Sequence, residues 1–398
     1  MKGVLKRITL LGSVSGRNAG DVALIASIMS EIRNLHPEGT FEIPTINPAF
    51  IKKHYSHLVA RPVSMLPWHL SVKMLGLPTF LSVRRADMVL VFDAVLFDRK
   101  LFNPLFNHMS ALALLIPYAK KHGKLVAYYN VGVGPVYTSL GKKILASISN
   151  QADLITVRDE DSLNLLREVG VTRLSIHVTA DAALNNQPAP PERVQEIMKE
   201  QGIFSDRRWI GMNVNTYVDT WVRSGEKGIS RRNFQNTMAQ VADSVMDDLD
   251  VDIVFFATQV MDIPLFQAII QEVKKKERVR LVTNRDYTNH EIMGLLGQME
   301  LFVGMRLHSL ILASAMYTPI VGLVYLPKVR SYLKEIGQPD QGLEFADFNA
   351  RRLVSLIEST WERRELIRQQ VERVGRLKEE SRKAARLVVE LLRQRDSG

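Results

Sequence analysis

The chain has 398 residues, more than a single hydrophobic core usually supports, so two domains are expected. Hydrophobic residues make up 46% and charged residues 24%, as in an ordinary globular protein, and the absence of cysteine excludes disulfides, thiolate metal sites and cysteine nucleophiles. The net charge of +10 indicates nucleic acid, an anionic membrane surface or anionic substrates as partners.

The first half of the chain alternates between strand and helix patterns. Such alternation predicts a parallel sheet with helices on both faces. A helix is expected over residues 22–35, after the first strand. The expected strands are residues 7–11, 88–92, 125–130, 154–157 and 175–179.

The loop at residues 12–21 joins the first strand to the first helix. Its glycines, Gly20 among them, suit close approach of the backbone to a ligand, and a helix N-terminus favours anions. The glycine spacing departs from the dinucleotide fingerprint and no Walker lysine follows, so nucleotide binding is weakly supported. Asp21 either caps the helix or acts in a site, where it accepts a proton or, with Asn18, binds sugar hydroxyls.

Glycines or charged residues also directly follow three later strands. Gly132 and Gly134 follow the strand that begins at residue 125, and serve either close ligand approach or a tight turn. Arg158 follows the strand ending at residue 157, and Asp181 follows the strand ending at residue 179. Asp159 is a residue type that caps helices, so local structure competes with a functional role here.

The second half predicts another parallel sheet, with strands at residues 209–214, 253–257, 279–283, 301–303 and 320–324. Prolines and polar residues interrupt the pattern at residues 185–191. The simplest architecture is α/β, with two Rossmann-like domains facing a cleft. We place the first domain at residues 1–187, the second at 188–350 and a basic helical segment that packs back on the body at 351–398.

The most informative segment runs from residue 300 to residue 329. It reads as strand, loop, helix and strand, with Arg306, His308 and Lys328 at element ends inside apolar runs. In such sheets, ligands sit outside the carboxyl ends of the strands. Three cationic or protonatable groups there predict a site for phosphate or carboxylate. The alternative is that His308 caps a helix or packs locally and Arg306 pairs with a carboxylate.

The C-terminal segment is amphipathic and basic. Residues 351–398 carry 13 Lys or Arg against 8 Asp or Glu, a net charge of +5, with apolar residues close to the 3.6 period. A solvated outer face is favoured over nucleic-acid binding, because the chain has no RNA- or DNA-binding motif. We therefore expect no nucleic-acid partner.

The sequence also bears on location. It begins without the pattern of a secretory signal peptide, and no apolar run reaches about 18 residues. Residues 63–78 mix Trp, Met and Leu with few charges, and would form either a peripheral membrane contact or a packed core segment. The expected location is the cytoplasm, either free or at the inner face of the membrane.

Taken together, these pieces resemble the polysaccharide pyruvyl transferase family. The resemblance implies a fold similar to the two-domain glycosyltransferase B type, and transfer of pyruvate from phosphoenolpyruvate to a sugar as a ketal. One segment departs from the family, which commonly has three glycines where this chain has Asp93 and Ala94, so the acceptor pocket there is in doubt. The matching segments are residues 18–24, 132–135, 157–162, 179–183, 306–308 and 325–329.

The chemistry that the resemblance implies assigns roles to the candidate residues. Arg306 and Lys328 would bind the phosphate and carboxylate of phosphoenolpyruvate, with Arg158 as a further cation. His308 would be the general acid or a phosphate ligand, and Asp21 a base or hydroxyl anchor. The remaining substrate-binding candidates are Asn18, Gly20, Gly132, Gly134 and Asp181.

The first domain would hold the sugar or lipid-linked saccharide acceptor and the second the phosphoenolpyruvate. Neither a metal nor another cofactor is required. Two alternatives stay open at this point: a glycosyltransferase that uses a nucleotide sugar, and a non-catalytic protein that binds sugars or anions.

Overall fold

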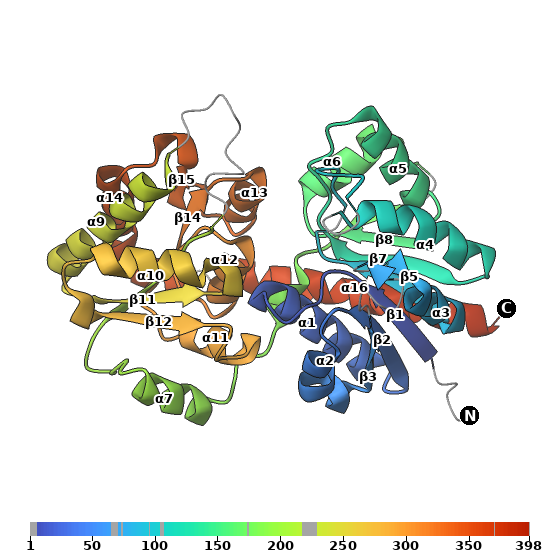
Figure 1. The fold of residues 1–398 in the computed structure, drawn as a ribbon, viewed down its shortest axis with the longest axis horizontal. Helices are drawn as coiled ribbons and strands as arrows, with labels where there is room; N and C mark the ends of the chain where they lie inside the picture. Colours follow the sequence, from blue (N-terminus) through green and yellow to red (C-terminus); the bar gives the residue numbers. More distant parts are fainter. Residues whose placement is uncertain are drawn as a thin grey trace. The chain divides into compact units, whose positions relative to one another are not determined.

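A computed structural model describes residues 6–64, 71–72, 75–94, 96–103, 107–172, 175–216, 229–369 and 371–397. Contacts divide the chain into two compact units (Figure 1). Unit 1 comprises Met1–Gly16, Asp21–Asn185 and Leu377–Gly398, and unit 2 comprises Arg17–Gly20 and Asn186–Arg376. The assignment of one part of the chain to the acceptor and another to phosphoenolpyruvate stays a prediction.

Unit 1 is built on a seven-stranded parallel sheet in the order β3-β2-β1-β6-β7-β8-β9. The strand β6 has the sequence MVLVF and is buried along its whole length, as expected for a parallel strand covered on both faces. A two-stranded antiparallel pair, β4 and β5, lies outside this sheet. The strands are β1 Lys6–Leu11, β2 Gly39–Thr45, β3 Ala60–Ser64, β4 Ser71–Val72, β5 Leu75–Gly76, β6 Met88–Phe92, β7 Leu125–Val131, β8 Leu154–Val157 and β9 Ile176–Val178.

Helices connect the strands of unit 1 in a repeated β-α-β pattern (Figure 1). The first helix joins β1 to β2, and its apolar residues Ile25, Ile28 and Ile32 are fully buried. The helices are α1 Ala19–Leu35, α2 Pro48–Tyr55, α3 Leu77–Arg85, α4 Met109–Lys121, α5 Ser139–Ser149 and α6 Glu160–Glu168, and α16 Val371–Ser397 enters this unit at Leu377.

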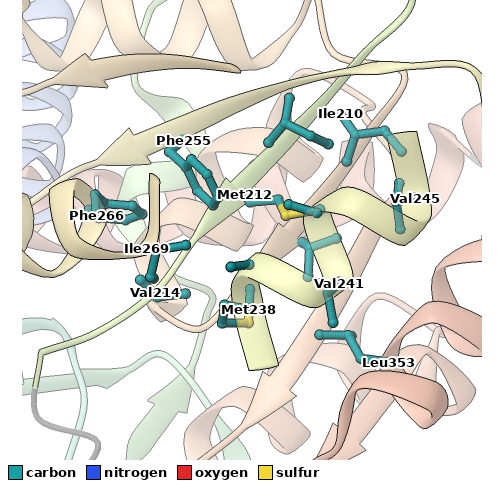
Figure 2. Close-up of a cluster of buried hydrophobic side chains, with 14 of the residues drawn as sticks. Ile210, Met212, Val214, Met238, Val241, Val245, Phe255, Phe266, Ile269 and Leu353 are labelled. Carbon is teal, nitrogen blue, oxygen red and sulfur yellow. The ribbon is translucent and has the colours of Figure 1, made fainter. Parts of the chain in front are cut away.

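Unit 2 is built on a six-stranded parallel sheet in the order β12-β11-β10-β13-β14-β15. Figure 2 shows part of its core, where Met212 and Phe255 of the sheet pack with Met238, Val241 and Phe266 of the covering helices. The strands are β10 Trp209–Asn213, β11 Asp252–Ala257, β12 Val279–Thr283, β13 Leu301–Gly304, β14 Ile320–Val324 and β15 Gly342–Glu344. The helices are α7 Pro191–Glu200, α9 Arg231–Leu249, α10 Ile263–Glu272, α11 Asn289–Leu296, α12 Leu307–Ala315, α13 Pro327–Glu335, α14 Ala350–Glu362 and α15 Arg364–Gln369.

The predicted fold class is confirmed: each half forms a parallel, helix-covered sheet, and a long helix ends the chain. The strand patterns missed β2 and β3, which form one side of the first sheet, and the short β15. Half of residues 63–78, for which a membrane contact was predicted, lies outside the described residues. Among the described helices, none is long and apolar enough to cross a membrane.

A buried polar network fastens the C-terminal helix to the first sheet. Asn130, in β7, is 2% exposed and adopts a φ of +47°. Its Nδ2 donates to the carbonyl oxygen and to the Oγ of Ser381 on α16, at 3.3 and 3.2 Å. Its Oδ1 lies 2.7 Å from the Thr179 hydroxyl and 3.0 Å from the Thr156 hydroxyl. The side chain thereby joins β7, β8 and the residue that follows β9 to α16.

We expect substitutions of Asn130 to destabilise the protein in two separable steps. Asn130→Gly keeps the left-handed backbone but removes the hydrogen bonds, and should cost about 1–3 kcal/mol. Asn130→Ala loses the same bonds and adds a Cβ in a left-handed conformation, for about 1–2 kcal/mol more. Urea unfolding measures both free energies. Equal stability of wild type and Asn130→Gly would show that the network contributes nothing.

A second contact between α16 and the body of unit 1 is an ion pair. Arg382 Nε donates to Glu31 Oε1 of α1 at 3.3 Å. The Glu31 side chain is 14% exposed, and burial raises its pKa from 4.5 to about 7 although Arg382 acts to lower it. The carboxyl group is therefore easier to protonate in the folded protein than in the unfolded chain.

This raised pKa predicts the sign of a pH effect. Between about pH 4.5 and 7 the folded protein holds a proton on Glu31 that the unfolded chain has lost, so stability falls as pH rises through this window. Glu31→Gln cannot titrate and should remove this fall, so the variant gains on wild type as pH rises from 5 to 8. Melting temperatures of both proteins across this range measure the difference. Parallel curves would contradict the assignment.

Candidate active site

Polar residues gather where four neighbouring strands of the second sheet end. The strands β11, β10, β13 and β14 are adjacent and parallel, so their carboxyl ends share one edge of the sheet. This is the edge at which parallel α/β sheets bind ligands. The polar residues that follow these strands are Asn213, Asn215, Thr258, Asp262, Arg306, His308, Tyr325 and Lys328.

Arg306 is held by a buried carboxylate. Its Nε donates to Asp262 Oδ2 at 2.5 Å and its Nη2 to Asp262 Oδ1 at 2.8 Å, a two-point contact that fixes the plane of the guanidinium group. Asp262 is fully buried and also accepts the backbone N–H of Thr216 at 3.0 Å. The structure thus shows the carboxylate partner that the sequence left as an alternative. Binding of phosphate by Arg306 stays a prediction, and the pair as a whole carries no net charge.

Two asparagines complete the support of Arg306. Asn213 is fully buried, accepts the Arg306 backbone N–H at 3.1 Å and donates to the Phe256 carbonyl at 2.7 Å. Asn215 accepts Arg306 Nη2 at 3.2 Å and donates to the Tyr325 hydroxyl at 3.2 Å. Each asparagine thus links Arg306 to a neighbouring strand or strand end. Sequence reasoning missed both, although two asparagines at one strand end were a usable signal.

The loop at Arg17–Gly20 packs on this edge and belongs to unit 2. The Ala19 N–H donates to the Thr258 carbonyl at 2.8 Å, and the Val260 N–H donates to the Arg17 carbonyl at 3.0 Å. Asn18 forms an isolated β-bridge with Gln259, and its Oδ1 accepts the Gly20 N–H at 3.0 Å. Asn18 and Gly20 therefore lie in the same unit as Arg306 and His308.

Gly20 lies against the His308 side chain. A Cβ at position 20 would come within 2.4 Å of both Cβ and Nδ1 of His308, a distance that side chains do not tolerate. His308 is the second residue of α12 and is partly buried. The glycine is thus required for the position of the histidine, a role that the sequence did not reveal.

Asp21 follows in the first turn of α1, where a carboxylate interacts favourably with the helix dipole. It falls in unit 1, and its role as a base or hydroxyl anchor stays a prediction.

Lys328 is the second residue of α13, directly after β14. Its side chain is partly buried and forms no hydrogen bond or ion pair with any residue that the structure describes. Unlike Arg306, it thus has no carboxylate partner among the described residues near the carboxyl edge of the sheet.

In unit 1, Arg158 lies among carboxylates. Its side chain is 8% exposed, with Nε 3.1 Å from Asp159 Oδ2 and Nη1 3.4 Å from Asp181 Oδ2. Burial acts to lower the pKa of Arg158, but Asp159, Asp181 and Asp93 together raise it above its ordinary value. A Cβ at Gly132 would lie 2.5 Å from the guanidinium carbon, so this glycine leaves room for the arginine. These neighbours give Arg158 a structural role and argue against direct binding of an anion.

The other unit 1 candidates also have local partners. Asp159 caps α6 by accepting the Ser162 N–H at 2.7 Å, and Asp181 Oδ1 accepts the Ala183 N–H at 2.9 Å. Gly134 has a φ of +95° in the turn after β7, and its N–H donates to the Leu96 carbonyl at 2.7 Å. A tight turn is enough to explain the glycine at position 134. Substrate binding by these residues stays a prediction.

Asp93 replaces the glycine expected from the family pattern, yet it keeps a glycine-like backbone. Its φ of +71° lies in the left-handed region, and its Oδ1 accepts the N–H of Ala94 at 2.6 Å. The side chain is 9% exposed and adds a negative charge near Arg158. The departure therefore changes the charge of this segment while its backbone stays in a conformation that glycine favours.

Comparison with known proteins places these observations in a family. The family model of polysaccharide pyruvyl transferase matches residues 18–327, well over half of the chain. The amylovoran biosynthesis protein AmsJ of Erwinia amylovora is 22% identical over 330 residues, which cover 76% of this chain and 73% of AmsJ.

Solved structures share the fold at low sequence identity. Anabaena HepE, in complex with UDP and glucose, aligns with a TM-score of 0.62 at 12% identity, over 98% of this chain and all of HepE. A putative UDP-N-acetylglucosamine 2-epimerase from Listeria monocytogenes aligns with a TM-score of 0.63 at 13% identity, over 96% and 94% of the two chains. These likenesses show a glycosyltransferase B type of fold. By its family match, the chain belongs to the polysaccharide pyruvyl transferase family and is a polysaccharide-modifying transferase.

Proposed function

We propose that the protein transfers pyruvate from phosphoenolpyruvate to a sugar of a polysaccharide precursor and forms a cyclic ketal. The observation that carries this proposal is the placement of Lys328, Arg306 and His308 at the carboxyl edge of the unit 2 sheet, in a chain of this family. Phosphoenolpyruvate needs cations for its phosphate and carboxylate and an acid for its methylene carbon. The three side chains offer both.

Two helix N-termini strengthen the case for an anion site. The helices α12 and α13 begin directly after β13 and β14, and neither has a side-chain hydrogen bond at its N-cap. The helix dipole makes these ends favourable for an anion, although Pro327 lacks an N–H and the N–H groups of Ser309 and Val329 donate to the carbonyls of Arg306 and Leu326. Lys328 lies in the first turn of α13, so its ammonium group adds to this potential. The positive end of each helix, Lys328 and the fixed Arg306 form the proposed phosphoenolpyruvate site.

The reaction needs one proton to carbon and two bonds from sugar oxygens. His308 donates a proton to the methylene carbon, which becomes the methyl group, while the adjacent carbon becomes electrophilic. A sugar hydroxyl adds to this carbon and passes its proton to a base, for which Asp21 is the candidate. The C–O bond to phosphate then breaks, and inorganic phosphate leaves with the proton that the base took up. A second hydroxyl of the sugar adds to the same carbon and closes the ketal, and the proton it loses balances the one that His308 gave.

Within this proposal Asp262 and the asparagines are positioning residues. They fix the guanidinium of Arg306 before the ligand arrives, so less conformational entropy is lost on binding. Asn18 and Gly20 form part of the loop that packs against His308. We keep the prediction made from the sequence that the acceptor binds to the first domain.

The HepE structure is a complex with UDP and glucose, so a nucleotide sugar is the alternative to phosphoenolpyruvate as the ligand of this chain. Thermal unfolding in the presence of phosphoenolpyruvate, UDP-glucose or neither separates the two, because selective binding to the native state raises the melting temperature. The proposal expects a rise with phosphoenolpyruvate. A rise with UDP-glucose alone would favour a glycosyltransferase, and no rise with either would favour a chain without this activity.

Lys328→Ala tests the anion site most cleanly. We expect it to weaken phosphoenolpyruvate binding by about 1.5–3 kcal/mol, the range for hydrogen bonds to charged groups, with the melting temperature unchanged. Arg306→Ala is less informative because it strands the buried carboxylate of Asp262. Lys334→Ala, an exposed lysine in the last turn of the same helix, is the matched control. If titration calorimetry gives both lysine variants the wild-type affinity, Lys328 does not bind the ligand.

His308 is tested by its chemical role. His308→Gln should lower turnover by about 10²–10⁴-fold, the usual contribution of a positioned acid, while phosphoenolpyruvate affinity changes far less. Gly20→Ala should reproduce part of this loss, because its Cβ displaces the histidine. Gly375→Ala is the control, since a Cβ there meets no atom within 4 Å.

The reaction run in D₂O gives an independent reading of the same step. Protonation at carbon should place one deuteron in the methyl group of the product, detectable by mass spectrometry. Product without deuterium would exclude the addition route, and near-normal turnover of His308→Gln would remove His308 as the acid.

A further inference from the structure

The positive charge of the chain is concentrated in one stretch of unit 1. Residues 43–152 contain 13 Lys or Arg and only three acidic residues, for a net charge of +10, which equals the net charge of the whole chain. Two of the three acidic side chains, Asp93 and Asp98, are 9% and 5% exposed. Arg85, Lys120 and Lys142 pair with carboxylates outside the stretch, and the charge that remains is predominantly positive.

Within this stretch, α3 and α4 expose leucines to solvent. Leu77, Leu81 and Leu114 are 60%, 42% and 55% exposed. The two helices pack together, with the rings of Phe80 and Tyr118 in edge-to-face contact at 4.9 Å between centroids. Leu77 and Leu81 flank Phe80 on one helix, and Leu114 lies one turn before Tyr118 on the other. The exposed leucines thus border a shared aromatic contact.

Basic side chains accompany these leucines. Arg84 and Lys121 are exposed near the C-terminal ends of α3 and α4, and neither helix contains an acidic residue. We call the set of Leu77, Leu81, Leu114, Arg84 and Lys121 the α3–α4 face. Apolar side chains that would enter a lipid layer, next to cations that would contact headgroups, are typical of surfaces that bind anionic membranes.

The charges of the α3–α4 face favour an anionic membrane over a second copy of the chain or nucleic acid as its partner. A symmetric contact between two copies would bring Arg84 and Lys121 of both together without an acidic residue on either helix, so like charges would repel. Nucleic acid would use the cations but would leave three leucines exposed to water. An anionic bilayer satisfies the leucines and the cations at once.

We infer that the α3–α4 face docks the protein on an anionic lipid bilayer. The inference deepens the proposed function and rests on it in one respect, since a lipid-linked saccharide acceptor would be presented at such a surface. The binding itself follows from the leucines and the cations, and it can be measured without any acceptor.

Sedimentation with vesicles tests the docking. The full chain should bind vesicles of phosphatidylglycerol and phosphatidylcholine in equal parts, and bind pure phosphatidylcholine far less. The triple variant Leu77→Asn, Leu81→Asn, Leu114→Asn should lose about tenfold or more in partitioning, because its apolar contact with the lipid is gone. Arg84→Gln and Lys121→Gln should each lose about fivefold, and added salt should weaken binding of the wild type.

Matched controls come from unit 2. Leu366 is 59% exposed, and Leu366→Asn should leave vesicle binding unchanged. Arg232→Gln and Arg351→Gln remove exposed charges from α9 and α14 and should also have little effect. Equal losses in these controls would show a general charge or solubility effect and would overturn the assignment to the α3–α4 face.

The remaining outcomes are also decisive. Wild-type protein that ignores anionic vesicles overturns the inference. A dimer in light scattering that the triple leucine variant converts to a monomer identifies a second copy as the occupant instead. Phosphoenolpyruvate affinity of the triple variant, measured by calorimetry, should equal that of the wild type. Vesicle binding without phosphoenolpyruvate binding would defeat the proposed function and leave the docking intact.

Discussion

The candidate active site depends on one buried ion pair. Asp262 is fully buried and is contacted by two nitrogens of Arg306 and one backbone N–H. A carboxylate buried without such partners would be strongly destabilising, so the arginine and the aspartate each require the other. Because the pair joins the segment after β11 to the segment after β13, it also fixes the start of α12. The position of His308, one residue into that helix from Leu307, is a consequence of this contact.

In both units a glycine leaves room for the side chain of a candidate site residue. Gly20 accommodates the ring of His308, and Gly132 accommodates the guanidinium of Arg158. The electrostatic environments of His308 and Arg158 differ. The histidine lies beside a neutralised arginine and near uncapped helix ends, whereas Arg158 is surrounded by carboxylates. The first setting favours an incoming anion and the second disfavours one, which is why we assign phosphoenolpyruvate to unit 2.

The sequence predicted the elements better than the contacts between them. Continuous apolar runs such as residues 88–92 and 320–324 identified the parallel strands, because strands covered on both faces need no polar alternation. The strand ends that carry Arg306, His308 and Lys328 were visible for the same reason. Asp262 was not, because it lies in a short 3₁₀ turn after β11 and only the folded sheet brings it to Arg306. The steric role of Gly20 was hidden too, since it depends on a residue nearly 290 positions away.

The net charge counted from the sequence differs from the charge that is available to a binding partner, because some cations are already in ion pairs. The C-terminal segment has a net charge of +5, but many of its cations are already engaged: Arg382 pairs with Glu31 and Glu379, and Arg368 pairs with Glu300. In residues 43–152 the few acidic groups are buried or engaged, as Asp98 is by the backbone N–H groups of Tyr137 and Thr138. Three cations there pair with carboxylates outside the stretch, namely Arg85 with Glu42, Lys120 with Asp153 and Lys142 with Glu168, but Arg84 and Lys121 form no ion pair with any residue that the structure describes. An anionic surface would therefore be attracted to this part of unit 1 rather than to the C-terminal helix, even though both looked basic in the sequence.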